Sequence, residues 1–100
     1  MSWVKDALNA LSQGQSVQVR PQGGSMRGRI ESGQLVTLTP VNLSDITIGD
    51  VIFVRWRGNY LLHLVKDIQS NRYLIGNNIG KINGWVEGED ILARATTTEG

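Results

Sequence analysis

A serine flanked by glycines is the first feature of the sequence that could do chemistry. Ser25 stands in the segment QGGSMRGRIESG (residues 22–33), directly after two glycines. Glycine lets the backbone approach a ligand closely, and N–H groups turned in one direction can hold the oxyanion that develops in acyl transfer. Glycine and serine in this order are also typical of a plain turn. Taken alone, the segment leaves a nucleophile and a turn serine as open alternatives.

The sole histidine is the second feature. Strand-like alternation in residues 60–66 places His63 on one face with Leu61 and Val65. Burial among aliphatic side chains disfavours the charged imidazolium, so it favours the neutral ring that a general base requires. The alternative is a core histidine whose ring nitrogens are satisfied by backbone groups.

Composition removes several other chemistries. The 100 residues contain no cysteine, one histidine, ten basic and nine acidic residues. Neither a disulfide framework nor a thiolate or histidine-rich metal site can be built from this set, so we expect no metal and no cofactor. Hydrophobic residues make up 40% and charged residues 19%, which excludes a disordered tail and a polybasic arm.

The elements that must position these residues are mostly strands. Residues 1–14 predict one short helix, with Ser2 as cap, apolar residues at helical spacing and Gly14 as stop. From Ser16 the apolar period becomes two, which predicts an all-β domain over residues 15–96 and a flexible tail at 97–100. We expect about six or more strands, and the candidates are residues 16–20, 35–39, 51–57, 60–66, 72–76 and 91–95.

The central element should be a hairpin. Turn residues from Arg57 to Tyr60 separate two strong strand patterns, and the first arm opens with four apolar residues, VIFV, typical of a strand buried on both faces. The stretch after Ile75 is rich in asparagine and glycine and reads as turns, with Trp85 and Val86 folding back onto the core.

Four ordered segments together resemble a known family. GGSM (23–26) with Ile30 and Gly33, IGDVIFV (48–54), YLLHLV (60–65) and YLIGNN (73–78) are similar to the motifs of the LexA and signal-peptidase superfamily of serine peptidases. The resemblance covers roughly residues 16–95 and implies that family's complex β-fold, as in a minimal, stand-alone, phage-repressor-like peptidase domain. It also implies a Ser-base mechanism without metal or cofactor.

The resemblance assigns roles to individual residues. Ser25 matches the nucleophile, and the backbone around Gly24 and Met26 matches the oxyanion site. His63, 38 positions further on, falls where the family carries its base. That base is a lysine in the LexA and bacterial signal-peptidase branches and a histidine in the archaeal and endoplasmic-reticulum branch, which HLV here resembles more closely. Lys66, three positions on, is expected on the opposite strand face and in solvent.

The sequence also departs from the family pattern. Arg27-Gly28 replaces the usual x-Pro, and Gln34 stands after Gly33 where the family generally has aspartate. Asn77 and Asn83 occupy the two positions where a carboxylate would orient the histidine. An amide oxygen can still accept an imidazole hydrogen bond, but it cannot stabilise the imidazolium by charge. Asp67 is the alternative orienter, and Asp50 matches a position typical of a structural turn.

Three functions follow from these observations. The first is a small soluble serine endopeptidase that uses Ser25 and His63 to cleave extended peptides. The second is a pseudo-peptidase that keeps the fold for peptide binding or dimerisation. The third, a β-barrel binding single-stranded nucleic acid through its arginines and aromatic residues, is disfavoured by a net charge of only +1.

Location and partners are constrained by the same sequence. The N-terminal apolar pattern is broken by Lys5, Asp6 and Asn9, unlike a signal peptide, and no apolar run approaches the ~18 to 20 residues of a membrane span. We therefore expect a cytoplasmic protein with a peptide substrate. Only 24 residues precede Ser25, so an autoproteolytic repressor with its own DNA-binding head is not expected. A homodimer is compatible with the family resemblance.

Overall fold

The computed structural model describes residues 3–21, 30–31, 33–78 and 80–97. These residues form a mostly β protein with one short N-terminal helix. In chain order the elements are α1 (Trp3–Ser12), β1 (Val17–Val19), β2 (Val36–Thr39), η1 (Leu43–Asp45), β3 (Val51–Trp56), β4 (Asn59–Gln69), β5 (Arg72–Gly76), β6 (Ile82–Glu87), η2 (Gly88–Asp90) and β7 (Ile91–Thr97).

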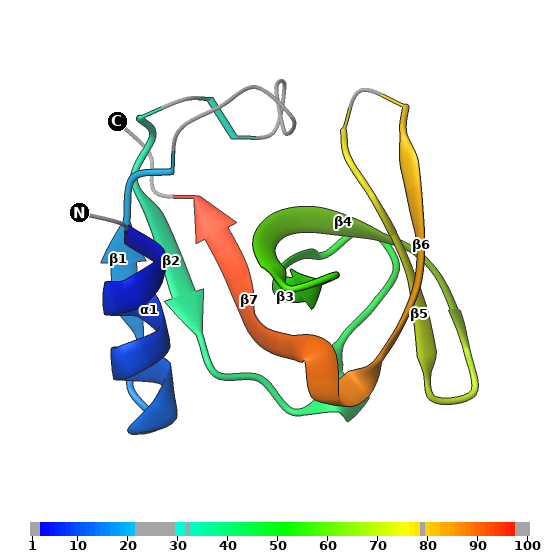
Figure 1. Ribbon diagram of the computed structural model, residues 1–100, viewed down its shortest axis with the longest axis horizontal. Helices are drawn as coiled ribbons and strands as arrows, with labels where there is room; N and C mark the ends of the chain where they lie inside the picture. Colours follow the sequence, from blue (N-terminus) through cyan, green and yellow to red (C-terminus); the bar gives the residue numbers. More distant parts are fainter. Residues whose placement is uncertain (1–2, 22–29, 32, 79, 98–100) are drawn as a thin grey trace.

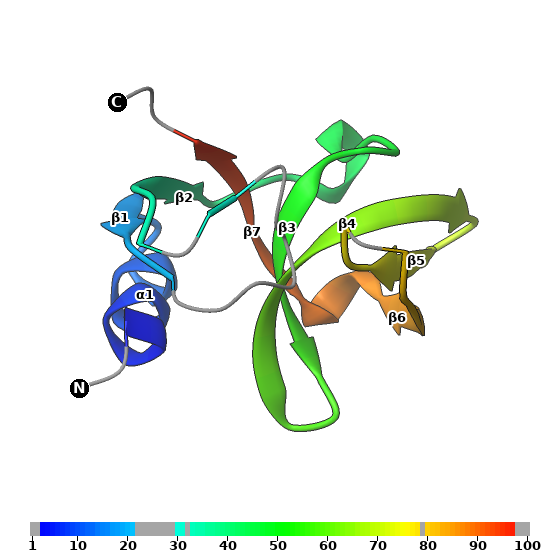
Figure 2. The ribbon, with the colours of Figure 1, turned by 90° about the horizontal axis from the view of Figure 1, so that it is seen from above.

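The described strands form one seven-stranded antiparallel sheet. Their spatial order is β1-β2-β7-β3-β4-β5-β6, so the last strand of the chain inserts between β2 and β3. Helix α1 lies beside β1 at one end of the sheet, and the β5–β6 hairpin forms the other end (Figure 1). A second view, turned by 90°, shows how strongly the β3–β4 ribbon twists out of the plane of its neighbours (Figure 2).

The β3–β4 hairpin is the central element, as the sequence predicts. Arg57 and Gly58 have φ angles of 50° and 81°, the paired left-handed conformation of a type I′ turn, which matches the twist of the flanking strands. All four residues of VIFV are buried, at 6% exposure or less. Strand β4 continues three residues beyond the expected Lys66, and Ile52 pairs with His63.

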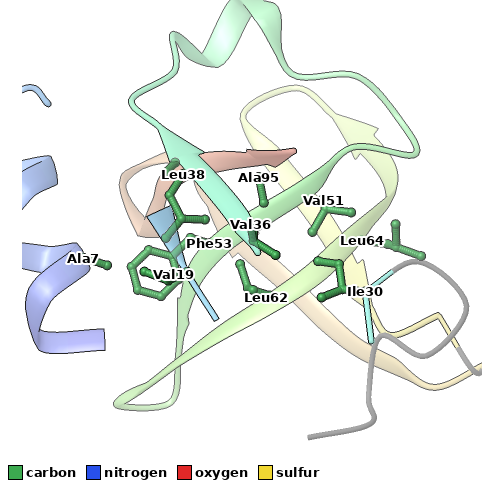
Figure 3. Close-up of a cluster of buried hydrophobic side chains, with 11 residues drawn as sticks. Ala7, Val19, Ile30, Val36, Leu38, Val51, Phe53, Leu62, Leu64 and Ala95 are labelled. Atoms are coloured by element: carbon green, nitrogen blue, oxygen red, sulfur yellow. The ribbon is translucent and has the colours of Figure 1, made fainter. Parts of the chain in front are cut away.

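Two hydrophobic clusters cover the two faces of this hairpin. Phe53 belongs to the first cluster and its neighbours Ile52 and Val54 to the second, because successive strand residues point to opposite faces. Figure 3 shows the first cluster, which collects Ala7 from α1, Ile30, Phe53, and Leu62 and Leu64 from β4. The second cluster consists of Ile46, Ile52, Val54, Val65, Tyr73, Ile75, Val86 and Ile91.

One strand, β6, was not predicted from the sequence. Residues 77–84 read as turns, yet β6 begins at Ile82 and pairs with β5. The register shifts between the pairs Gly76–Ile82 and Ile75–Gly84, which leaves Asn83 as an extra residue. Such a bulge breaks the period of two, so the alternation that marks a strand is lost. The packing predicted for Trp85 is wrong: this side chain is 38% exposed, although Val86 is buried.

Among the described residues, no helix is long and apolar enough to cross a membrane.

Candidate active site

Ser25, Gly24 and Met26 lie outside the described residues, but both flanks of their segment are fixed. Ile30 is buried at 4% exposure and packs beside Leu62 and Leu64 of β4 (Figure 3). The Gly33 N–H donates to the Pro21 carbonyl at 2.8 Å, and the Arg20 guanidinium donates to the Gly33 carbonyl at 3.0 Å. The two ends of the segment that carries Ser25 are therefore tied together.

The turn that follows Ile30 uses Gln34 as an acceptor, at the position where the family that the sequence resembles generally has aspartate. The Glu31 N–H donates to the Gln34 side-chain oxygen, and the Gln34 N–H donates to the Glu31 carbonyl, both at 3.0 Å. Asp50 holds its own turn in the same way, accepting the Thr47 N–H at 2.9 Å and donating to the Thr47 carbonyl at 3.1 Å. Both turns need only an acceptor oxygen, which an amide supplies as well as a carboxylate.

His63 occupies the face that alternation predicts. It lies directly opposite Ile52 of the second cluster, and only 6% of its surface is exposed. Its Nδ1 lies against the Leu62 carbonyl oxygen. Because a carbonyl only accepts hydrogen bonds, this contact requires a proton on Nδ1, so the neutral form of the ring is the tautomer with its lone pair on Nε2. No group among the described residues donates to Nε2.

Asn77 reaches the neighbourhood of His63 through the strand register. Leu64, the residue after His63, pairs with Gly76 at the end of β5, so Asn77 follows the last pair of this register, on the side where His63 lies on β4. Asn77 is buried at 6% exposure. Its Oδ1 accepts the Lys81 N–H and its own N–H donates to the Lys81 carbonyl, each at 2.9 Å. The amide oxygen therefore closes the connection between β5 and β6.

The other candidate orienters are engaged locally. The Asp67 carboxylate accepts the Ile68 N–H at 2.8 Å and the Gln69 side-chain amide at 3.5 Å. Asp50 has the turn role that the sequence assigned to it. Within the described residues, the Nδ1 of His63 thus faces a backbone carbonyl and not one of these carboxylates.

Lys66 and Asn83 are more buried or less hydrogen-bonded than a polar strand residue usually is. Lys66 was expected in solvent but is half-buried, because its Cε carbon lies against Gly76. The Asn83 side-chain oxygen is buried and accepts no hydrogen bond from the described residues. An unpaired buried oxygen is unusual in a native structure, and here it coincides with the bulge in β6.

Of the three arginines that the nucleic-acid hypothesis assigns as contacts, Arg55, Arg57 and Arg72, the first two already have partners. Arg55 donates to the Asp90 carboxylate at 2.8 and 3.1 Å. The hydrogen bond and the charge of Asp90 raise the pKa of the Arg55 guanidinium. The Arg57 guanidinium lies 5.0 Å above the Trp56 ring. Both cations are therefore partly neutralised or covered before any nucleic acid approaches.

One hollow in the described part of the chain lies away from His63. A groove of about 640 Å³ lies where η1, the β4–β5 turn and the start of η2 meet, lined by Leu43, Ile46, Ile68 and Tyr73 together with polar residues that include Glu87 and Glu89. Neither His63 nor Asn77 lines it. The described residues also hold no cluster of three or more histidine, aspartate or glutamate side chains suited to a metal ion.

Comparison with known proteins adds no relative: no family model, curated protein or solved structure matches the chain.

Proposed function

We propose that the chain is a small serine peptidase of the LexA and signal-peptidase type that cleaves extended peptides. The observation that carries the proposal is the placement of His63, a buried imidazole whose Nδ1 faces the Leu62 carbonyl, so that Nε2 is the nitrogen left to act as a base. A neutral ring with a free lone pair is the form in which histidine acts as general base. The match of the four ordered motifs supplies the nucleophile, Ser25.

The reaction then follows the usual course of acyl transfer. His63 Nε2 takes the hydroxyl proton as Ser25 Oγ attacks the peptide carbonyl, and N–H groups around Gly24 and Met26 hold the oxyanion. The protonated imidazole returns the proton to the leaving amine. Water then hydrolyses the acyl-enzyme, with the same histidine as base. No metal or cofactor takes part in this scheme.

The described ends of the segment that carries Ser25 have fixed positions. Ile30, five positions after Ser25, packs beside Leu62 and Leu64, the two chain neighbours of His63, whose side chains point to the face of β4 opposite to that of His63. The tie between Pro21 and Gly33 closes the base of the same segment. The end of this segment at Ile30 therefore lies beside the stretch of β4 that carries the histidine, and the proposal requires the segment to bring Ser25 to the face of His63.

The test measures cleavage of a mixed peptide library by mass spectrometry at about pH 6 to 9, the range in which a histidine base operates. We expect Ser25→Ala and His63→Ala each to reduce cleavage at least 100-fold. Ser44→Ala, at an exposed serine, is the control and should leave it unchanged. Cleavage by either site variant at the level of the Ser44→Ala control would overturn the proposal.

A second function is favoured by Asn77. The oxygen of this amide is committed to Lys81, and no carboxylate among the described residues bonds to His63. The same fold would then bind peptides without cutting them. This function predicts peptide-induced NMR shifts around His63 with no product.

The variant Asn77→Asp separates the two functions. Aspartate still accepts the Lys81 N–H, and it adds a negative charge across the register from His63, where an imidazolium would be stabilised. We expect cleavage to rise at least tenfold if the chain is a peptidase. A binding module should show no cleavage with either residue.

A further inference from the structure

Strand β6 is an open edge of the sheet. It lies at one end of the strand order and, of the described strands, pairs only with β5 (Figure 1). An edge strand directs a row of unpaired N–H and C=O groups outward, and these can pair with another strand. The bulge at Asn83 interrupts only the first part of β6, so Gly84–Glu87 keeps a regular register.

This edge carries exposed apolar side chains. Ile82 is 51% exposed and Trp85 is 38% exposed, and they are two of the four large hydrophobic residues exposed in the described part of the chain. Residues three apart in a regular strand point to opposite faces. Here the bulge brings both onto one face, because Trp85 pairs with Leu74 and Ile82 with Gly76, two positions apart on β5.

The charges along the edge are arranged with opposite signs at its two ends. Lys81 precedes β6 and Glu87 ends it, and both side chains are exposed. Neither forms an ion pair with another described residue. When two copies of this strand run antiparallel, the basic end of each lies beside the acidic end of the other. Parallel pairing would instead bring like charges together.

We propose that two copies of the chain associate through β6, paired antiparallel about a two-fold axis. The backbone edge supplies the hydrogen bonds, Ile82 and Trp85 of both copies form a shared apolar cluster, and Lys81 of each copy faces Glu87 of the second copy. Such an isologous contact is self-complementary by symmetry. Because regular pairing is limited to a few residues, the contact is small and the dimer dissociates on dilution. The proposal does not depend on peptidase activity.

Analytical ultracentrifugation over a wide range of concentrations tests the proposal. The wild-type chain should show a reversible monomer–dimer equilibrium. Trp85→Glu and Ile82→Lys should each weaken association at least tenfold, since a buried tryptophan is a typical energetic centre of an interface. Ile48→Glu is the matched control: Ile48 is 61% exposed but lies in a turn away from β6, so its association should match the wild type.

A charge variant tests the orientation. Lys81→Glu should weaken association more than Lys81→Gln, because only glutamate repels Glu87 of the second copy. Circular dichroism of each variant establishes that it folds, and Ile82→Lys changes a side chain already half exposed. A wild-type chain that stays monomeric at all concentrations overturns the proposal. So does a dimer that Ile48→Glu weakens as much as Trp85→Glu does, which would place the contact elsewhere.

Discussion

His63 and Asn77 show how a single side chain acquires its role from the strand that carries it. The histidine proton is directed by the carbonyl of the preceding residue, Leu62, and the asparagine oxygen is used by Lys81 four residues later. Both contacts are local, whereas the juxtaposition of the two residues depends on the register between β4 and β5. Alternation in the sequence predicted the face of His63, but the partner of each polar atom depends on turn geometry that alternation does not encode.

Gly76 is a residue whose lack of a side chain is required by packing. A Cβ at this position would lie 2.3 Å from the Lys81 carbonyl oxygen and 3.2 Å from the Ile82 Cα. Since both are backbone atoms at the point where the chain enters β6, Gly76→Ala should displace the Asn77–Lys81 connection and reduce the free energy of unfolding by about 1 to 3 kcal/mol. Urea denaturation measures this loss.

Gly88 provides the matched comparison. A Cβ there would lie 2.4 Å from Cδ1 of Leu43, an exposed side chain that can change rotamer. Gly88→Ala should therefore cost less than about 1 kcal/mol. If the two variants were equally destabilised, the backbone contact at Gly76 would not be the cause.

At the scale of elements, the sequence predicted the helix and the strands in which apolar residues recur at a regular spacing. The N-terminal helix, the β3–β4 hairpin, β2, β5 and β7 all lie within a few residues of their expected positions. Strand β6 was missed because Asn83 and Gly84 are turn-forming residues and the bulge interrupts the alternation. The sequence predicted the turn at Asp50 but not the one at Gln34. In both turns the side-chain oxygen accepts a backbone N–H, a role that an amide and a carboxylate share although they are different residue types.

The turn of the β3–β4 hairpin allows a test at this scale. Arg57 has a left-handed φ, which disfavours any residue with a Cβ other than asparagine or aspartate, but its guanidinium also packs over Trp56. Arg57→Ala keeps the strain and loses the ring contact, so it should lower the free energy of unfolding by about 0.5 to 1 kcal/mol.

Arg57→Asn loses the same ring contact but creates Asn-Gly, the favoured pair for a type I′ turn. The gain and the loss should offset each other, so we expect a stability within about 0.5 kcal/mol of the wild type. Thermal and urea unfolding of both variants measure the difference. An asparagine variant as unstable as the alanine variant would show that the turn conformation contributes nothing.

At the scale of the whole molecule, the β3–β4 hairpin contributes side chains to both hydrophobic clusters. Phe53 is fully buried in the first cluster, with its ring 5.5 Å from Trp3 and 5.9 Å from Tyr60, and Ile75 is fully buried in the second. Because β3 and β4 send alternate residues to both faces, neither cluster can lose its packing while the hairpin stays intact. Unfolding should therefore be a single cooperative transition.

Truncation of each cluster tests this cooperativity. Phe53→Ala should cost about 3 to 5 kcal/mol and Ile75→Ala about 2 to 5 kcal/mol, and Phe53→Leu and Ile75→Val keep the chain folded if the alanine variants do not fold. Tryptophan fluorescence reports both faces, since Trp3 contacts Phe53 and Trp56 packs against the second cluster. In every variant the fluorescence and far-UV circular dichroism transitions in urea should coincide. Separate transitions, with only one altered by each substitution, would mean that the two faces unfold independently and that the shared hairpin does not couple them.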